Sequence, residues 1–323
     1  SSTTQLISLG SATLSIGGDL NLTGISLTYG TSTVKFTATT TAKNIYSAGQ
    51  TFYRVTFDGV NGGWTIADTM TLTNNFTLTN GAVIQNGPLI VGGSFSQATG
   101  TTFTCTDPQT NTMAVTGNFS IPNTNGAFRR HTAAGYIYDV YGLQGVKCWL
   151  GTSFTLGSDI SATKTSSWSG GFYPIGNNST PYTGTFNGAG YTISSLYINR
   201  TTTYIGLFGY VNSPGSISNL NLTSVNIYGY GTSGSYGSYP GGTGGDGQTA
   251  YIGGLAGFSN GTITNCSIAG NIYGWGGTGG NGGDGASGSY GGEGGYGGYG
   301  GTGFIGGLVG YNSNSISSSY STA

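Results

Sequence analysis

The sequence predicts an all-β protein, a solenoid built from many short strands. Three observations lead to this fold class: helix-forming residues are scarce, apolar side chains alternate with polar ones, and related strands recur. Glu occurs once (Glu293) and Lys four times in 323 residues, whereas Thr, Ser, Gly, Asn, Tyr and Val dominate. The dominant residues favour strands and turns over helices.

Short runs with a two-residue period mark the expected strands. Met70 and Leu72 are the apolar side chains of one such run, and Phe76 and Leu78 are those of the next. Successive side chains of a strand point to opposite faces, so this period places one face against a core. No window shows a clear apolar period of 3.6 residues, and no helix is therefore expected.

The strands recur at intervals that indicate stacked coils. Phe76, Phe95 and Phe119 stand in similar surroundings and lie 19 and 24 residues apart. Repeats of about 20 residues or more, with short strands and small turn residues, are typical of solenoids. Stacking also accounts for the rarity of charge, because like charges at matching positions of neighbouring strands repel each other.

The charge balance excludes several classes of function. Lys and Arg number 8, Asp and Glu number 9, and charged residues make up 5% of the chain. So little positive charge argues against nucleic acid as a partner and against attachment to an anionic membrane surface. No apolar run approaches about 18 residues, so membrane insertion is not expected. Ser1 to Thr4 lack the pattern of a secretion signal, which we expect to have been removed already.

A more specific pattern occurs three times in the second half of the chain. Each copy has the core Gly-Leu-x-Gly, then a turn rich in Ser and Asn, then a short strand. The Leu is expected in the core, and the glycines at a corner that needs positive φ or close backbone packing. The repeat residues are Gly206, Leu207, Gly209, Gly254, Leu255, Gly257, Gly307, Leu308 and Gly310.

This repeat resembles the GLUG motif of secreted bacterial surface proteins, including adhesins similar to filamentous haemagglutinin. The resemblance covers about residues 136–323 and implies a right-handed parallel β-helix with a role in adhesion or architecture. Residues 1–128 resemble only in general terms the β-helical passenger regions of surface exoproteins. We therefore expect two portions, an N-terminal β-rich solenoid (1–128) and a GLUG-like β-helix (129–323).

Two glycine-rich insertions, at residues 230–251 and 275–304, interrupt the second portion. One reading is a flexible linker. The other follows from the Gly-Gly-x triplets, because an extended polyproline-II backbone has three residues per turn and no internal hydrogen bonds. Such chains can bond laterally. Both insertions follow the sequence Asn-Ile-Tyr-Gly, at 226–229 and 271–274, so they are expected to leave from the same face and to pair as a sheet or bundle.

Residues suited to catalysis are sparse, and we expect no enzyme, no cofactor and no metal site. His131 is the one histidine and stands beside Arg129 and Arg130, which suggests a surface position. The nine carboxylates are scattered, and metal sites need several ligands at short spacing. Asp139 and Asp159 are the one candidate acid pair, since a solenoid can place them on successive coils.

The cysteines and tyrosines leave alternatives open. Cys105 and Cys148 form a disulfide in an oxidising compartment or remain two free thiols, and Cys266 fits a small buried apolar position. Tyrosines near the insertions suit contact with sugars or a neighbouring subunit, or pack their own loops. They are Tyr236, Tyr239, Tyr290, Tyr296 and Tyr299.

Together these observations predict an extracellular or cell-surface protein with a structural and adhesive role, as a subunit of a filament or matrix. The expected partner is another copy of the chain, with glycans or a cell surface as further partners. The alternatives are an adhesin that binds carbohydrate or a receptor without polymerising, an ice-binding solenoid, and a polysaccharide-cleaving β-helix enzyme.

Overall fold

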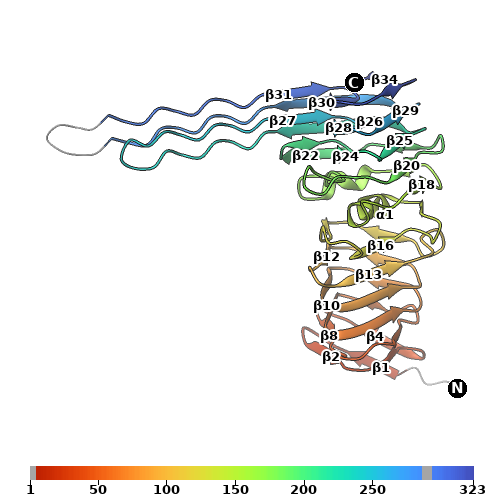
Figure 1. The fold of residues 1–323 in the computed structure, drawn as a ribbon. Helices are drawn as coiled ribbons and strands as arrows, with labels where there is room; N and C mark the ends of the chain where they lie inside the picture. Colours follow the sequence, from red (N-terminus) through yellow and green to blue (C-terminus); the bar gives the residue numbers. More distant parts are fainter. Residues whose placement is uncertain (1–4, 286–292) are drawn as a thin grey trace. The chain divides into compact units, whose positions relative to one another are not determined.

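A computed structural model describes residues 5–285 and 293–323 (Figure 1). The chain forms two compact units. The first runs to Trp149 and takes in Ser167–Ser169, and the second comprises Leu150–Ser166 and Gly170–Ala323. The predicted all-β class is confirmed, because the described strands pair in parallel sheets and the α-helical content is one short helix. No described helix is long and apolar enough to span a membrane.

The elements of the first unit are β1 (Gln5–Ser8), β2 (Thr13–Ile16), β3 (Leu20–Asn21), β4 (Ile25–Thr28), β5 (Thr33–Phe36), β6 (Lys43–Tyr46), β7 (Thr51–Phe52), β8 (Arg54–Ile66), β9 (Met70–Leu72), β10 (Phe76–Gln85), β11 (Leu89–Val91), β12 (Phe95–Gln97), β13 (Thr102–Cys105), β14 (Met113–Val115), β15 (Phe119–Ser120), β16 (Phe128–Arg130), β17 (Tyr136–Ile137), α1 (Val140–Gly145) and the 3-10 turn η1 (Val146–Cys148).

The elements that follow are β18 (Phe154–Leu156), β19 (Ile160–Ser161), the 3-10 turn η2 (Thr163–Ser167), β20 (Thr185–Asn187), β21 (Thr192–Ser194), β22 (Tyr197–Thr201), β23 (Tyr204–Ile205), β24 (Phe208–Val211), β25 (Ser216–Ser218), β26 (Asn221–Tyr230), β27 (Ala250–Gly253), β28 (Ala256–Ser259), β29 (Thr262–Thr264), β30 (Ser267–Trp275), β31 (Gly303–Gly306), β32 (Val309–Asn312), β33 (Ile316–Ser317) and β34 (Tyr320–Thr322).

A column of phenylalanines forms the core of the first unit. Its largest sheet has the strand order β15-β12-β10-β8-β5-β2, and the register places Phe76 beside Phe95 and Phe95 beside Phe119. The recurrence of these residues at 19 and 24 positions is therefore the spacing of stacked strands. Ring centroids lie 4.8 Å apart for Phe76 and Phe95 and 5.1 Å apart for Phe95 and Phe119. Each such pair contributes about 0.5–1.5 kcal/mol beyond area burial.

The Gly-Leu-x-Gly repeats align in the second unit. The strand sets β24-β28-β32 and β25-β29-β33 pair in parallel, with Ile217, Ile263 and Ile316 in register. Leu207 and Leu255 are fully buried. None of the six repeat glycines has a positive φ. Close packing explains them instead: a Cβ on Gly209 would stand 2.3 Å from the carbonyl oxygen of Gly176.

Neutral side chains form ladders on the outside of these sheets, as the low charge predicts. Asn219 Nδ2 donates to Asn187 Oδ1 at 3.0 Å, and Asn265 Nδ2 donates to Asn219 Oδ1 at 2.9 Å. Each amide both donates and accepts, so stacked Asn side chains bond to one another without the repulsion that stacked charges would meet.

Candidate functional site

The two insertions form a projecting structure, here called the glycine arm. It consists of four extended limbs: limb A (231–239), limb B (241–249), limb C (276–285) and limb D (293–302), which extend side by side away from the sheets of the second unit (Figure 1). The insertions begin at equivalent points, because Tyr230 of β26 is in register with Trp275 of β30. They also return at equivalent points, since Ala250 of β27 is in register with Gly303 of β31.

Backbone hydrogen bonds join the limbs at every third residue. The N–H groups of Gly231, Gly234 and Gly237 in limb A donate to the carbonyl oxygens of Trp275, Thr278 and Asn281 at 2.9, 2.8 and 2.8 Å. This period is that of a polyproline-II chain, which leaves its backbone groups free for lateral bonds. The predicted lateral pairing is therefore confirmed for the described residues, and a flexible linker is not what they form.

The central limbs B and C each bond to three others. Limb B donates to limb A through the N–H groups of Gly242, Gly245 and Gln248. Limb D accepts bonds from Gly244 and Gly247 of limb B and from Ala250, the first residue of β27. Limb C donates to limb B through Gly277, Gly280 and Gly283, and limb D donates to limb C through Gly295, Gly298 and Gly301. All of these bonds are 2.7 to 2.9 Å long. The arm is therefore an ordered bundle whose limbs are held together by regularly spaced backbone hydrogen bonds.

Glycine is required at many of the positions where two limbs touch. A Cβ on Gly234 would stand 1.8 Å from the carbonyl oxygen of Gly245, and one on Gly280 would stand 1.9 Å from that of Ser235. Backbone atoms cannot move aside at such distances without breaking the lateral bonds. Gly297 differs, because its Cβ would stand 3.4 Å from the nearest atom. In the Gly-Gly-x triplets, glycines therefore tend to mark the positions that face a neighbouring limb.

Most of the side chains of the arm belong to two outer faces; Thr232, Ser235, Ser238 and Gln248 belong to neither. The A–C face presents Ser233, Tyr236, Tyr239, Thr278, Asn281 and Asp284, and the B–D face presents Thr243, Asp246, Thr249, Tyr296, Tyr299 and Thr302.

Polar contacts link neighbouring limbs across each face. On the A–C face Thr278 Oγ1 donates to Ser233 Oγ at 2.9 Å. On the B–D face Asp246 Oδ1 accepts the N–H of Tyr299 at 2.8 Å. Side chains of adjacent limbs therefore lie in register.

Four of the five predicted contact tyrosines lie on these faces. Tyr296 and Tyr299 are 83% and 84% exposed, and Tyr236 and Tyr239 are 61% and 64% exposed. Tyr290 lies outside the described residues. The aromatic side chains of the neighbouring β-strands, by contrast, stack on one another, as Tyr251 does on Phe304 with centroids 5.1 Å apart. The backbone bonds of limb D do not involve the rings of Tyr296 and Tyr299.

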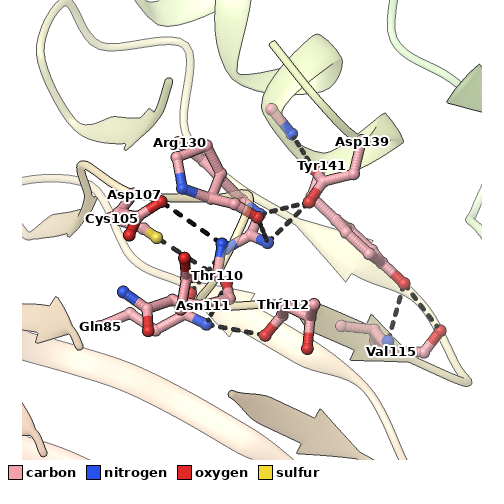
Figure 2. A network of polar contacts seen from close by, with 12 residues as sticks. Gln85, Cys105, Asp107, Thr110, Asn111, Thr112, Val115, Arg130, Asp139 and Tyr141 are labelled. Atoms are coloured by element: carbon pink, nitrogen blue, oxygen red, sulfur yellow. Dashed lines mark hydrogen bonds and ion pairs between the residues drawn. The ribbon is translucent and has the colours of Figure 1, made fainter. Parts of the chain in front are cut away.

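The candidate acid pair is divided between the two units, and each carboxylate has a structural partner in its own unit. Asp139 forms an ion pair with Arg130, with Nη2 and Oδ2 2.6 Å apart, and its Oδ1 accepts the N–H of Gly142 to cap α1 (Figure 2). Asp159 Oδ1 accepts the N–H of Thr192 at 2.8 Å. Both side chains therefore stabilise the backbone around them.

Arg130 is the centre of a buried polar network that the sequence analysis missed (Figure 2). Its side chain is fully buried. Besides Asp139, its Nη1 donates to Gln85 Oε1 at 2.8 Å. Gln85 Nε2 in turn donates to the carbonyl oxygens of Asn111 and Thr112. The network fixes the loop between β13 and β14, which is a structural task. Arg130 and Gln85, which form the central contact, lie 45 positions apart in the sequence, so no local sequence pattern predicts it.

The expected surface position of His131 is wrong. The side chain is 8% exposed, and its ring lies edge-on to Trp149 with centroids 5.5 Å apart. Its Nδ1 lies 2.9 Å from the carbonyl oxygen of Thr132. Burial lowers the pKa of His131, because the charged imidazolium is poorly solvated there. The packing against Trp149 explains the burial.

The cysteines are three free and buried thiols. Cys148 Sγ donates to the carbonyl oxygen of Pro122 at 3.3 Å, and Cys105 Sγ lies 3.9 Å from that of Asn111. Of the two alternatives for Cys105 and Cys148, the structure shows the free thiols. Cys266 is buried as expected.

Comparison with known proteins finds two partial similarities. The chain is 35% identical over 130 residues to a Gly-rich membrane protein of Evansella cellulosilytica, which is 39% of this chain and 13% of that protein. It is 30% identical over 132 residues to halomucin of Haloquadratum walsbyi, which is 38% of this chain and 1% of halomucin. The chain thus matches a small part of the length of these relatives. No protein-family model and no solved structure matches it.

Proposed function

We propose that this chain is an extracellular structural protein of the cell surface that holds out the glycine arm. The arm carries the proposal. It extends from the second unit, it is ordered by lateral bonds, and at 3.1 Å per residue each limb is about 30 Å long. The names of the two relatives, a Gly-rich membrane protein and a halomucin, also indicate proteins of the cell surface.

We propose further that the parallel sheets coil as a right-handed β-helix of the GLUG type. The in-register stacking of the three Gly-Leu-x-Gly copies supports this architecture. A β-helix would give the arm a firm base, because every coil bonds to the next along its whole length.

A non-catalytic role is part of the proposal, without cofactor or metal. The positions of the carboxylates support it. Several of them accept a backbone N–H from a neighbouring strand or limb at 2.7 to 2.8 Å: Asp19 from Asn44, Asp68 from Ser47, Asp159 from Thr192 and Asp246 from Tyr299. A carboxylate used in this way stabilises the stack and is not positioned as an acid or base.

The finer form of the proposal is a subunit of a filament or matrix whose partner is a further copy of the chain. Exposed apolar side chains on strands of both units support it, among them Leu6 on β1 and Ile305 on β31. Strands of this kind accept a further strand readily.

Two experiments test the proposal at its two levels. Immunogold labelling of source cells with an antibody against the arm is expected to mark the cell surface, and labelling confined to the interior would contradict a surface role. Negative-stain electron microscopy of the purified chain across a dilution series is expected to show fibres with a regular axial repeat. Isolated particles at every concentration would contradict the filament proposal, and the proposal of a surface protein that does not polymerise would remain.

A further inference from the structure

The phenol rings of Tyr296 and Tyr299 on limb D take no part in the bonds that hold the arm together. Tyr296 and Tyr299 are 83% and 84% exposed, and within the described part of the chain neither ring packs on another aromatic side chain. Their carbonyl groups hold limb D in place by accepting the N–H groups of Gly244 and Gly247, both at 2.8 Å. The backbone alone therefore positions limb D, and the two phenol rings are left facing solvent.

The spacing of the rings matches an extended sugar polymer. Residues three apart on a polyproline-II chain point in the same direction and stand about 9 Å apart. That distance is close to the length of one disaccharide in a β-1,4-linked hexose chain. Tyr296 and Tyr299 can therefore contact alternate sugars of one chain, each on the apolar face that a pyranose ring offers to an aromatic ring.

Polar groups stand beside each ring. Asp246 is bonded to the backbone N–H of Tyr299 through Oδ1, and no bond within the described residues occupies its Oδ2. Thr243 stands next to Tyr296, because the N–H of Gly244 donates to the Tyr296 carbonyl. A carboxylate and a hydroxyl group are suitable partners for sugar hydroxyls. The A–C face also carries two exposed tyrosines, Tyr236 on limb A and Tyr239 at the turn where this limb ends, and Asp284 lies within 3.5 Å of the Tyr236 hydroxyl.

The charge of the arm selects among sugars. Its charged side chains in the described residues are Asp246, Asp284 and Glu293, and no Lys or Arg follows Arg200 in the sequence. Glycans that carry carboxylate or sulfate groups would meet only like charge. A neutral polymer would meet none of this repulsion.

From this arrangement we propose that the two outer faces of the glycine arm bind extended, neutral, β-linked hexose polysaccharide chains through paired tyrosines: Tyr296 with Tyr299, and Tyr236 with Tyr239. The lateral bonds fix the backbone that carries the rings before the ligand arrives, so no backbone ordering is needed on binding. The proposal goes beyond a structural role, because an arm that serves only as a spacer needs no exposed rings.

Affinity electrophoresis of the full chain tests the proposal. The gels contain hydroxyethyl cellulose, galactomannan or, as the acidic control, polygalacturonate. We expect the neutral polymers to retard the chain and polygalacturonate to leave it unaffected. The variant Y236A/Y239A/Y296A/Y299A should lose the retardation, with an apparent affinity at least about tenfold lower. The matched variant with four Tyr→Phe changes keeps the rings and should retain most of it.

Two controls keep the result decisive. Tyr320→Ala removes an exposed ring outside the arm and should bind as the unchanged chain does. Thermal unfolding of the Ala variant should match that of the unchanged chain, since the four side chains are exposed.

Lack of retardation in every neutral polymer would overturn the proposal, as would undiminished binding by the Ala variant. Sedimentation adds an independent readout. If the Ala variant loses a concentration-dependent association that the unchanged chain shows, and no polymer binds, the rings serve contacts between copies. Fibres in electron micrographs are independent of this outcome, so the structural proposal and the sugar site can fail separately.

Discussion

Gly298 of limb D stands so close to limb B that a Cβ at this position would lie 2.0 Å from the carbonyl oxygen of Gly245. Its own N–H donates to the carbonyl oxygen of Gly280 in limb C at 2.8 Å. One residue without a side chain thus joins three limbs. A Cβ on Gly297, its neighbour, would make only an ordinary contact, 3.4 Å from the carbonyl oxygen of Gly280. Gly297 can therefore accommodate a methyl group and Gly298 cannot, and substitution by Ala tests this difference.

Gly298→Ala is expected to open the arm, and Gly297→Ala to leave it intact. The new methyl group in Gly298→Ala must displace limb B, which breaks the bonds around it and exposes backbone groups at a cost of about 1–3 kcal/mol each. Hydrogen exchange of the amides of Gly245 and Gly280 reports this directly, and both should exchange faster in Gly298→Ala. Equal protection in the two variants would show that the limbs do not pack as described.

Much of this arrangement could be predicted from the sequence because it depends on repetition. The recurrence of Phe76, Phe95 and Phe119 reproduces the register of the strands. The shared Asn-Ile-Tyr-Gly segments place both insertions at matching points, and β26 and β30 confirm this. When parallel strands stack in register, similar residues recur at matching positions of neighbouring strands, so their spacing in the sequence indicates which residues are neighbours in space.

The parts that depend on unique contacts could not be predicted. Arg129, Arg130 and His131 form a polar cluster in the sequence, which suggests a surface. The structure buries Arg130 because Asp139 and Gln85 both bond to its guanidinium group. The short helix α1 was also unforeseen, because its start depends on the side chain of Asp139. Neither contact repeats along the chain, so no period reveals it.

Phe95→Ala should destabilise the first unit strongly. Phe95 is fully buried and lies between the rings of Phe76 and Phe119, so its loss leaves a cavity in the phenylalanine column. Substitutions of this kind cost about 3–5 kcal/mol. Chemical denaturation followed by fluorescence measures the change. Ile90→Ala serves as the control, because Ile90 of β11 is 44% exposed and its substitution should change the unfolding free energy far less than that of the fully buried Phe95.

Asp139→Asn tests the buried ion pair while keeping the helix cap, since Asn caps helices as well as Asp does. The variant leaves the Arg130 charge buried without its counter-charge, and the unfolding free energy should fall by about 3–5 kcal/mol. Adding Arg130→Met removes the stranded charge, so the double variant should recover part of the loss. Asp19→Asn, at an exposed site, should be nearly neutral. A double variant less stable than Asp139→Asn would mean that Arg130 contributes mainly through its other bonds.

The three cysteines should be free and protected from reaction in the folded chain. Burial raises the pKa of Cys105, Cys148 and Cys266, because the thiolate is poorly solvated inside the protein. The thiolate is the reactive form, so a short pulse of iodoacetamide near neutral pH should label none of them, and all three should react after unfolding.

The raised pKa of the three thiols also makes the stability of the folded chain depend on pH. A raised folded-state pKa means that the thiols contribute their full stabilising effect below the unfolded pKa and lose it as the pH rises through the folded value. Intact mass spectrometry without reductant checks the pairing: three labels after unfolding are expected. A single label would establish a disulfide, such as Cys105 to Cys148, and would contradict the structure.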